Sequence, residues 1–290
     1  MKTTSLILIC AMALMLFSGC GGQQADFDIA ATTLPVYQFT SMLCQGTGLT
    51  VTRLVTESVS CLHDYSLNVR QVKAAEAAEL IVINGAGLED FMEDLLEGKQ
   101  TIVASKDVPL LENCHDHGDH EDHHHEADSH IWLSPANAMV MVTNIMEGLV
   151  AAYPEHTEKL QWNGILLLTK LKMLLDYGNQ QLSPLKNRKL LTFHDGFGYF
   201  AQCFDLHIVA AVEEEAGAET SARQLVNLIE LVQQLHIPAV FTETNGSDAS
   251  AKVICAETGA GLYTLDMAIS GEDYFTAMYH NIDTIREALA

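Results

Sequence analysis

The sequence predicts an α/β fold with two lobes, each built on a four-stranded parallel sheet. Short β-branched or apolar runs alternate with longer segments of helical period, which is the pattern of parallel strands joined by helices. The pattern occurs twice, once on each side of a long stretch of helix-forming residues. A chain of 290 residues with 48% hydrophobic content is large enough to bury two such cores.

The first lobe is predicted to cover residues 26–156. We expect its strands at residues 29–33, 50–55, 80–84 and 101–104, and its helices at residues 37–43, 68–78 and 89–97. Residues 114–130 interrupt this order because they hold seven of the thirteen histidines, together with six acidic residues. Such a segment has almost no apolar side chains to bury, so we predict a His-rich loop there.

A linker helix at residues 157–182 is predicted to join the lobes. Ser134-Pro135 begins a preceding helix, with serine as N-cap and proline in the first turn, and Tyr153-Pro154 ends it. A continuous helix between lobes implies limited hinge motion.

The second lobe, residues 183–290, repeats the alternation. Its strands are expected at residues 189–192, 207–212, 239–242 and 262–265, and its helices at residues 197–203, 221–235, 247–258 and 274–289.

The first residues are typical of a bacterial export signal. Lys2 precedes an apolar run over residues 6–17, which is shorter than the roughly 20 residues that span a bilayer. Ser18-Gly19-Cys20 then supplies the small residues before a cysteine that lipoprotein processing needs. We therefore expect residues 1–19 to be a signal peptide, Cys20 to be the lipid attachment site, and residues 20–25 to be a tether. The predicted location is extracytoplasmic, on a bacterial membrane.

The net charge limits the partners that the protein can bind, and the cysteine content indicates a possible disulfide. A formal net charge of −23 disfavours nucleic acid as a partner and raises the local concentration of cations. Cys44 and Cys61 flank one predicted helix-turn-strand unit and could close a short disulfide loop in an oxidising compartment. If Cys61 is not in a disulfide, its sulfur is a further candidate metal ligand.

Four side chains lie at or just after predicted strand ends: His63, His130, His194 and Asp266. In open α/β sheets this edge is where ligands bind. The first two belong to the first lobe and the last two to the second. Three imidazoles and one carboxylate suit four-coordinate Zn²⁺, whereas Mn²⁺ prefers more oxygen. Copper and nickel also accept imidazole, so the ligand set places zinc first without excluding other metals.

At these residues the chain resembles the metal-specific solute-binding proteins of zinc and manganese ABC importers. The resemblance rests on five segments: His63-Asp64-Tyr65, Asn84-Gly85-Ala86-Gly87-Leu88-Glu89, His130-Ile131-Trp132-Leu133-Ser134-Pro135, residues 193–200, and Leu265-Asp266. It implies that the four side chains named above are the metal ligands and that a rigid helix joins the lobes. Histidine at the third ligand position, which is His194 here, is typical of zinc-type members of that family. The Pro-Gly and acidic residue usual before the first ligand are replaced here by residues 58–61.

The resemblance implies a binding protein, not an enzyme, which captures Zn²⁺ and delivers it to permease and ATPase subunits of an importer. We expect it to act as a monomer, with Asp195 and Trp132 as candidates for orienting the ligands. A manganese or other divalent-metal protein of the same type remains an alternative. A zinc hydrolase is a further alternative, although four protein ligands leave no open coordination position. A metal-dependent adhesin would leave the ligand set unexplained.

The His-rich loop is predicted to be an auxiliary, low-affinity collector of metal ions. Its candidate ligands are His115, His117, His120, His123, His124 and His125. Because neutral imidazole is the form that binds metal, collection should fade below roughly pH 6. A solvated tract without a role in transport is the alternative. The loop also contains the His-Glu-x-x-His spelling of metalloproteases, but that motif needs a helix with an apolar face, which this tract lacks.

Overall fold

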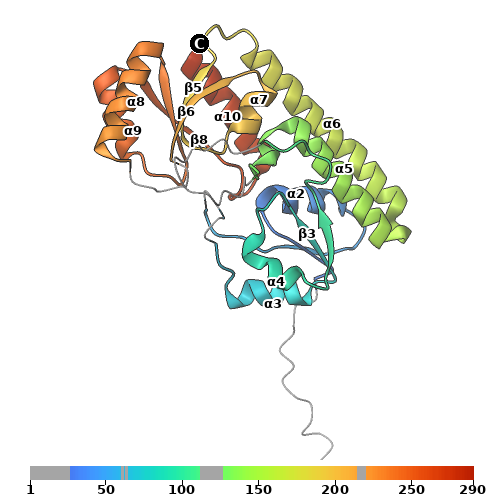
Figure 1. Cartoon of the computed structure of the whole chain (residues 1–290). Coiled ribbons are helices and arrows are strands. Elements are labelled where there is room, and N and C mark those ends of the chain that lie inside the picture. The colour runs from blue at the N-terminus through green and yellow to red at the C-terminus, as the bar shows by residue number, and fades with distance from the viewer. Residues whose placement is uncertain (1–26, 60–61, 63–64, 112–126, 214–219) are drawn as a thin grey trace, which may run out of the picture.

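The computed structural model describes residues 27–59, 62, 65–111, 127–213 and 220–290. Within these ranges two four-stranded sheets form two lobes, and one long helix runs along both of them (Figure 1). The predicted fold class is therefore confirmed. The predicted signal peptide and tether, and residues 112–126 of the His-rich region, lie outside the described residues. No helix in the described ranges has the length and apolarity needed to cross a bilayer.

The first sheet has the strand order β2-β1-β3-β4, and every neighbouring pair is parallel. The two central strands are completely buried, which explains their unbroken apolar sequences. The elements of this lobe are β1 (Ile29–Ala31), α2 (Leu34–Leu43), β2 (Val51–Arg53), α3 (Val69–Ala77), β3 (Leu80–Ile83), η1 (Asp90–Met92), α4 (Glu93–Leu96), β4 (Gln100–Val103), η2 (Ile131–Leu133) and α5 (Pro135–Ala152).

The second sheet repeats this topology with the order β6-β5-β7-β8, again all parallel. Helices α8 and α9 cover one of its faces, and α10 lies on the other (Figure 1). The elements are β5 (Lys189–His194), α7 (Gly198–Cys203), β6 (His207–Glu213), α8 (Ala222–Leu235), β7 (Ala239–Glu243), α9 (Ala249–Thr258), β8 (Gly261–Leu265) and α10 (Tyr274–Leu289).

Local capping explains where several helices begin. Asn68 and Ser221 each form a capping box, with Gln71 and Gln224 respectively at the third helical position. Ser134 accepts a hydrogen bond from the backbone of Asn137, as its Ser-Pro sequence predicts. The single helix predicted at residues 89–97 is wrong, because the backbone leaves helical geometry at Met92 and divides the segment into η1 and α4.

After the short helix η3 (Pro154–His156), helix α6 (Thr157–Leu182) connects the lobes with the bounds predicted for the linker. Its 26 residues give a length of about 39 Å. It packs against α2 and α5 in the first lobe and against α10 in the second. Gly178 also allows α6 to approach Phe204 at the end of α7, because a β-carbon there would lie 2.2 Å from the Phe204 ring. The helix is thus fixed to both lobes along its length.

Candidate metal site

Strand ends place polar side chains at the carboxyl edge of the second sheet. In the second lobe, β5 ends at His194, the neighbouring strand β7 ends at Glu243, and Asp266 follows β8. In the first lobe, His130 is the N-cap residue of η2. Ligands bind at this edge in open α/β sheets, so residues from both lobes are available in one region.

His130 is held by its own short loop. It is 4% exposed, and Asp128 Oδ1 accepts hydrogen bonds from both its backbone N–H, at 2.9 Å, and its Nδ1, at 2.8 Å. An ionised carboxylate can only accept, so Nδ1 carries the hydrogen and Nε2 keeps the lone pair. Asp128 thereby leaves Nε2 as the nitrogen that is able to bind a metal ion.

The Asn84–Glu89 turn supports the residue before His130. Asn84 Nδ2 donates to the carbonyl oxygen of Ser129 at 3.0 Å. The turn needs small residues, since Gly85, Ala86 and Gly87 all have positive φ and a β-carbon on Gly85 would meet Ser105 Oγ at 2.3 Å. Glu89 closes the turn by accepting hydrogen bonds from the backbone N–H groups of Asn84 and Gly85.

Glu89 makes stability dependent on pH. Burial raises the pKa of its carboxyl from 4.5 to about 7, although hydrogen bonds from Thr32 and the turn oppose the shift. Between these values the folded protein holds a proton that the unfolded chain has released. The stability that Glu89 contributes is therefore fully present below pH 4.5 and is lost as the pH rises to about 7. Over this range the free energy of unfolding falls by roughly 3 kcal/mol at most.

Urea unfolding of metal-free protein at several pH values, compared with Glu89→Gln, checks this prediction. The variant cannot titrate, and its amide places a donor opposite the Gly85 N–H, so we expect lower stability at acidic pH. The free energy of unfolding of the wild type minus that of Glu89→Gln should fall between pH 4.5 and pH 7. A difference that stays constant across this range would contradict the prediction.

His194 lies at the end of β5, where it is 1% exposed. Gly196 leaves room for its ring, because a β-carbon at that position would lie 3.1 Å from His194 Nε2 and 2.5 Å from Met267 Cε. Its Nδ1 lies 3.8 Å from Glu243 Oε1, a buried carboxylate at the end of the neighbouring strand. Each of the two histidines therefore has a carboxylate on its Nδ1 side.

The Nε2 atoms of His130 and His194 lie 3.3 Å apart, across the boundary between the lobes. Two nitrogen ligands of a tetrahedral zinc ion, each about 2.0 to 2.1 Å from the metal, are separated by about 3.3 to 3.4 Å. The two rings meet at 83°, with their centroids 5.1 Å apart. This pair therefore has the spacing of two ligands of one tetrahedral zinc ion.

Trp132 ties the lobes together beside this pair. Its Nε1 donates to the carbonyl oxygen of Met267 at 2.7 Å, and its own carbonyl oxygen accepts from Tyr274 Oη at 2.7 Å. Its ring also packs against the ring of His130, with centroids 5.3 Å apart. We predicted that Trp132 orients a ligand, and the structure gives its N–H a different partner, on the other lobe.

Among the described residues, no further predicted ligand joins this pair. Within the described ranges, no group of three His, Cys, Asp or Glu side chains is placed to hold a metal ion. Asp266 is partly buried, and its Oδ1 accepts from the backbone N–H of Ala268 at 2.8 Å. His63 lies outside the described residues, as do Cys20 and the six auxiliary histidines of the loop. The roles of these residues and of Asp195 stay predictions.

Of the two cysteines in the predicted disulfide, the structure describes only Cys44. Cys44 is a free, buried thiol at the C-terminal end of α2, and burial raises its pKa to about 12. Since α2 runs antiparallel to the strands, Cys44 lies at the amino edge of the sheet. Cys61 itself lies outside the described residues.

Sequence reasoning missed Asp128 and Glu243, the two carboxylates beside the histidines. Asp128 stands two residues before His130, inside a tract that composition assigns to a loop. Glu243 directly follows the strand predicted at residues 239–242, so the rule of strand ends was sufficient to find it.

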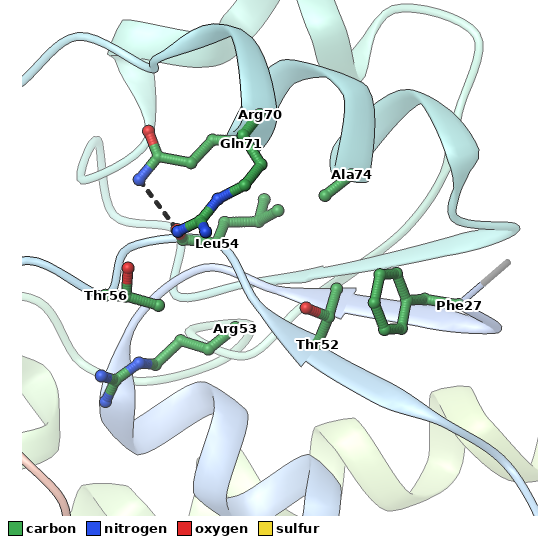
Figure 2. Close-up of a pocket in the computed structure, with 8 residues that line it drawn as sticks. All are labelled: Phe27, Thr52, Arg53, Leu54, Thr56, Arg70, Gln71 and Ala74. Carbon is green, nitrogen blue, oxygen red and sulfur yellow. Dashed lines mark hydrogen bonds between the residues drawn. The ribbon is translucent and has the colours of Figure 1, made fainter. Parts of the chain in front are cut away.

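A pocket of about 270 Å³ lies elsewhere, between β2 and α3 (Figure 2). Arg53, Arg70 and Phe27 are among the residues that line it, and Gln71 closes one side by donating to the carbonyl oxygen of Leu54 at 2.9 Å. None of its lining residues is a predicted metal ligand, so this pocket is separate from the histidine pair.

Comparison with known proteins identifies the family. Residues 29–288 match the model of the ZnuA family, described as zinc-uptake complex component A, periplasmic. The chain belongs to this family. It is 32% identical over 308 residues to the zinc-binding lipoprotein AdcA of Streptococcus pneumoniae, an alignment that covers 99% of this chain and 61% of AdcA. The chain thus spans less than two thirds of the length of that relative.

Solved structures of the family have the same two-lobed fold. The crystal structure of ZnuA is 28% identical, with a TM-score of 0.80 over 91% of this chain and 100% of ZnuA. The Zn(II)-bound ZnuA-like domain of Streptococcus pneumoniae AdcA is also 28% identical, with a TM-score of 0.77 over 91% of this chain and 99% of the domain. The family resemblance stated from the motifs is therefore confirmed.

Proposed function

We propose that this chain captures Zn²⁺ outside the cytoplasm and delivers it to an ABC importer. The observation that carries the proposal is the 3.3 Å separation of His130 Nε2 and His194 Nε2, each presented from a different lobe. An ion bound by both would cross-link the lobes and stabilise their association by mass action. Zinc is the cargo in this proposal, and membership of a zinc-uptake family supports it.

In this proposal His63 and Asp266 complete the coordination of the ion. The resulting set of three imidazoles and one carboxylate suits tetrahedral zinc better than manganese. Four protein ligands also leave no position for a reactive water, which disfavours a zinc hydrolase. The adhesin alternative has no support from the buried histidine pair, because a host protein cannot reach side chains that are 4% and 1% exposed.

The proposal includes the predicted partners and domain boundaries. Residues 26–156 and 183–290 would be the metal-binding lobes on either side of the linker helix, and the protein would act as a monomer. Permease and ATPase subunits of an importer would receive the zinc. Attachment through lipid on Cys20 is supported by the name of the AdcA relative, a zinc-binding lipoprotein. The histidines of the loop would collect zinc at lower affinity.

Competitive titration of metal-free protein with Zn²⁺ and Mn²⁺ tests the proposal. We expect one tight site that prefers zinc and that survives deletion of residues 114–127, because the pair His130 and His194 lies outside that deletion. Weaker auxiliary binding should be lost with the deleted loop. A site that binds manganese more tightly would overturn the assignment of zinc.

The deletion also separates the two candidate binding regions. If tight binding disappears with residues 114–127 but survives in His130→Ala, the site between the lobes is wrong. Zinc-limited growth of cells that carry each variant then connects binding to uptake, and we expect growth to fail only where the tight site is lost.

A further inference from the structure

We propose that Asp128 is a positioning residue that presents His130 Nε2 to the metal, and that Tyr199 of the other lobe fixes Asp128 in that position. This inference rests on the proposed function and adds two residues that lie outside the predicted ligand set. It starts from the hydrogen bonds around Asp128, which connect the lobes at a second place besides Trp132.

The first step is the double contact between Asp128 and His130. One carboxylate oxygen, Oδ1, accepts from both the backbone N–H and the ring Nδ1 of His130. Two bonds from one residue to one oxygen fix both the backbone of the loop and the rotation of the ring. Because Asp128 is only 6% exposed, water competes little for these bonds.

The second step is the contact between Asp128 and Tyr199 of α7. Tyr199 Oη donates to the carbonyl oxygen of Asp128 at 2.8 Å and accepts from the N–H of Leu111 at 2.9 Å. The side chain is 1% exposed, and burial raises its pKa to about 12, so the hydroxyl keeps the proton that it donates. One hydroxyl from the second lobe thus holds residues on both sides of 112–126.

The third step is the close approach of α7 to the Asp128 side chain. Gly198 is the first residue of α7, and a β-carbon there would lie 3.1 Å from Asp128 Oδ2. Glycine therefore lets the carboxylate lie against the beginning of the helix. Leu111 N–H is bonded to Tyr199, and the Leu111 carbonyl oxygen accepts from Asp128 N–H at 2.9 Å, so the backbone of Asp128 is held from two sides.

These contacts join the two metal-binding histidines through the protein itself. Tyr199 lies five residues after His194 in the second lobe, and its bond to Asp128 ends two residues before His130 in the first. The second lobe therefore supports the position of Asp128 and, through it, the orientation of His130. Zinc affinity should consequently depend on residues that do not touch the ion.

The test measures zinc affinity by chelator competition and the tautomer of His130 by ¹⁵N NMR of metal-free protein. We expect Asp128→Ala to weaken zinc binding by about 10- to 100-fold, as for other residues that orient a metal-binding histidine. Tyr199→Phe, which removes only the hydroxyl, should weaken it by about 3- to 10-fold. The wild type should carry hydrogen on Nδ1, and Asp128→Ala should show a mixture of both tautomers.

Two further variants serve as controls. Tyr177→Phe removes a hydroxyl that donates to Asp283 Oδ1 at 2.7 Å, far from the histidines in sequence, and should leave zinc affinity and the tautomer unchanged. Asp128→Asn keeps an oxygen that accepts the same two bonds, so it should retain the Nδ1–H tautomer and lose less affinity than Asp128→Ala. If Asp128→Ala fails to fold, Asp128→Asn and Tyr199→Phe still decide the question.

Unchanged affinity and an unchanged tautomer in folded Asp128→Ala would overturn the inference. Equal losses in Tyr199→Phe and Tyr177→Phe would overturn the part assigned to Tyr199. Failure of the proposed function is a distinct result: His130→Ala would then bind zinc as tightly as the wild type. The tautomer measurement needs no metal, so it tests the positioning role in either case.

Discussion

Replacing His194 with alanine is expected to weaken zinc binding by about 100- to 1000-fold. Structural zinc sites with four ligands bind with roughly 10 to 16 kcal/mol, so an equal share for each ligand is about 2.5 to 4 kcal/mol. In the proposed site His194 is a ligand from the second lobe, and its Nε2 lies 3.3 Å from His130 Nε2 of the first. The variant should therefore also lose most of the rise in melting temperature that zinc gives the wild type.

Chelator competition and thermal unfolding, each with and without zinc, measure the two effects. His207→Ala is the matched control, because His207 begins the neighbouring strand β6 at the opposite edge of the same sheet and is exposed. We expect this control to bind zinc like the wild type. If His194→Ala keeps the wild-type affinity, zinc is not bound between the lobes and the proposed mechanism is wrong.

Replacing Trp132 with alanine is expected to destabilise the metal-free protein by about 3 to 5 kcal/mol, the usual cost of removing a buried aromatic side chain. Trp132 is completely buried and belongs to a core cluster whose members come from both lobes. Its loss also leaves the Met267 carbonyl without the 2.7 Å hydrogen bond from the indole. Urea unfolding of metal-free protein measures the change.

The other tryptophan of the chain supplies the control. Trp162 lies on the outer side of α6 and is 57% exposed, so Trp162→Ala should change the free energy of unfolding by no more than about 0.5 kcal/mol. Trp132→Phe separates packing from hydrogen bonding, with an expected cost of about 1 to 3 kcal/mol for the unpaired carbonyl. Equal stability of Trp132→Ala and Trp162→Ala would show that Trp132 does not join the lobes.

The sequence predicted those features that depend on local periodicity. Both sheets and the linker helix follow from alternating apolar patterns and from capping residues such as Ser134. The strand-end rule selected His194 for the same reason, because it needs only the position of a residue along its own strand, β5. The local pattern did not reveal the break at Met92, where the expected helix divides into η1 and α4.

Features that depend on distant packing were not predictable in this way. The bond from Tyr199 to Asp128 joins residues 71 positions apart, and no local pattern indicates it. The pairing of Cys44 with Cys61 was predicted from closeness along the chain, which does not give closeness in space, and Cys44 is a free, buried thiol at the end of α2. The fourth ligand, Asp266, stays a prediction since its position depends on how the segment after β8 meets the first lobe.

The two carboxylates beside the histidines also determine the charge balance of the site. A divalent ion between His130 and His194 would bring two positive charges into a region where the neighbouring side chains are at most 6% exposed. Burying such a charge without compensation is very costly. Asp128 and Glu243, when ionised, supply one negative charge each, and Asp266 of the proposed ligand set supplies a third, so a divalent ion offsets most of this negative charge. A monovalent ion would leave a larger net negative charge there, which makes the valence of the ion a basis for selection.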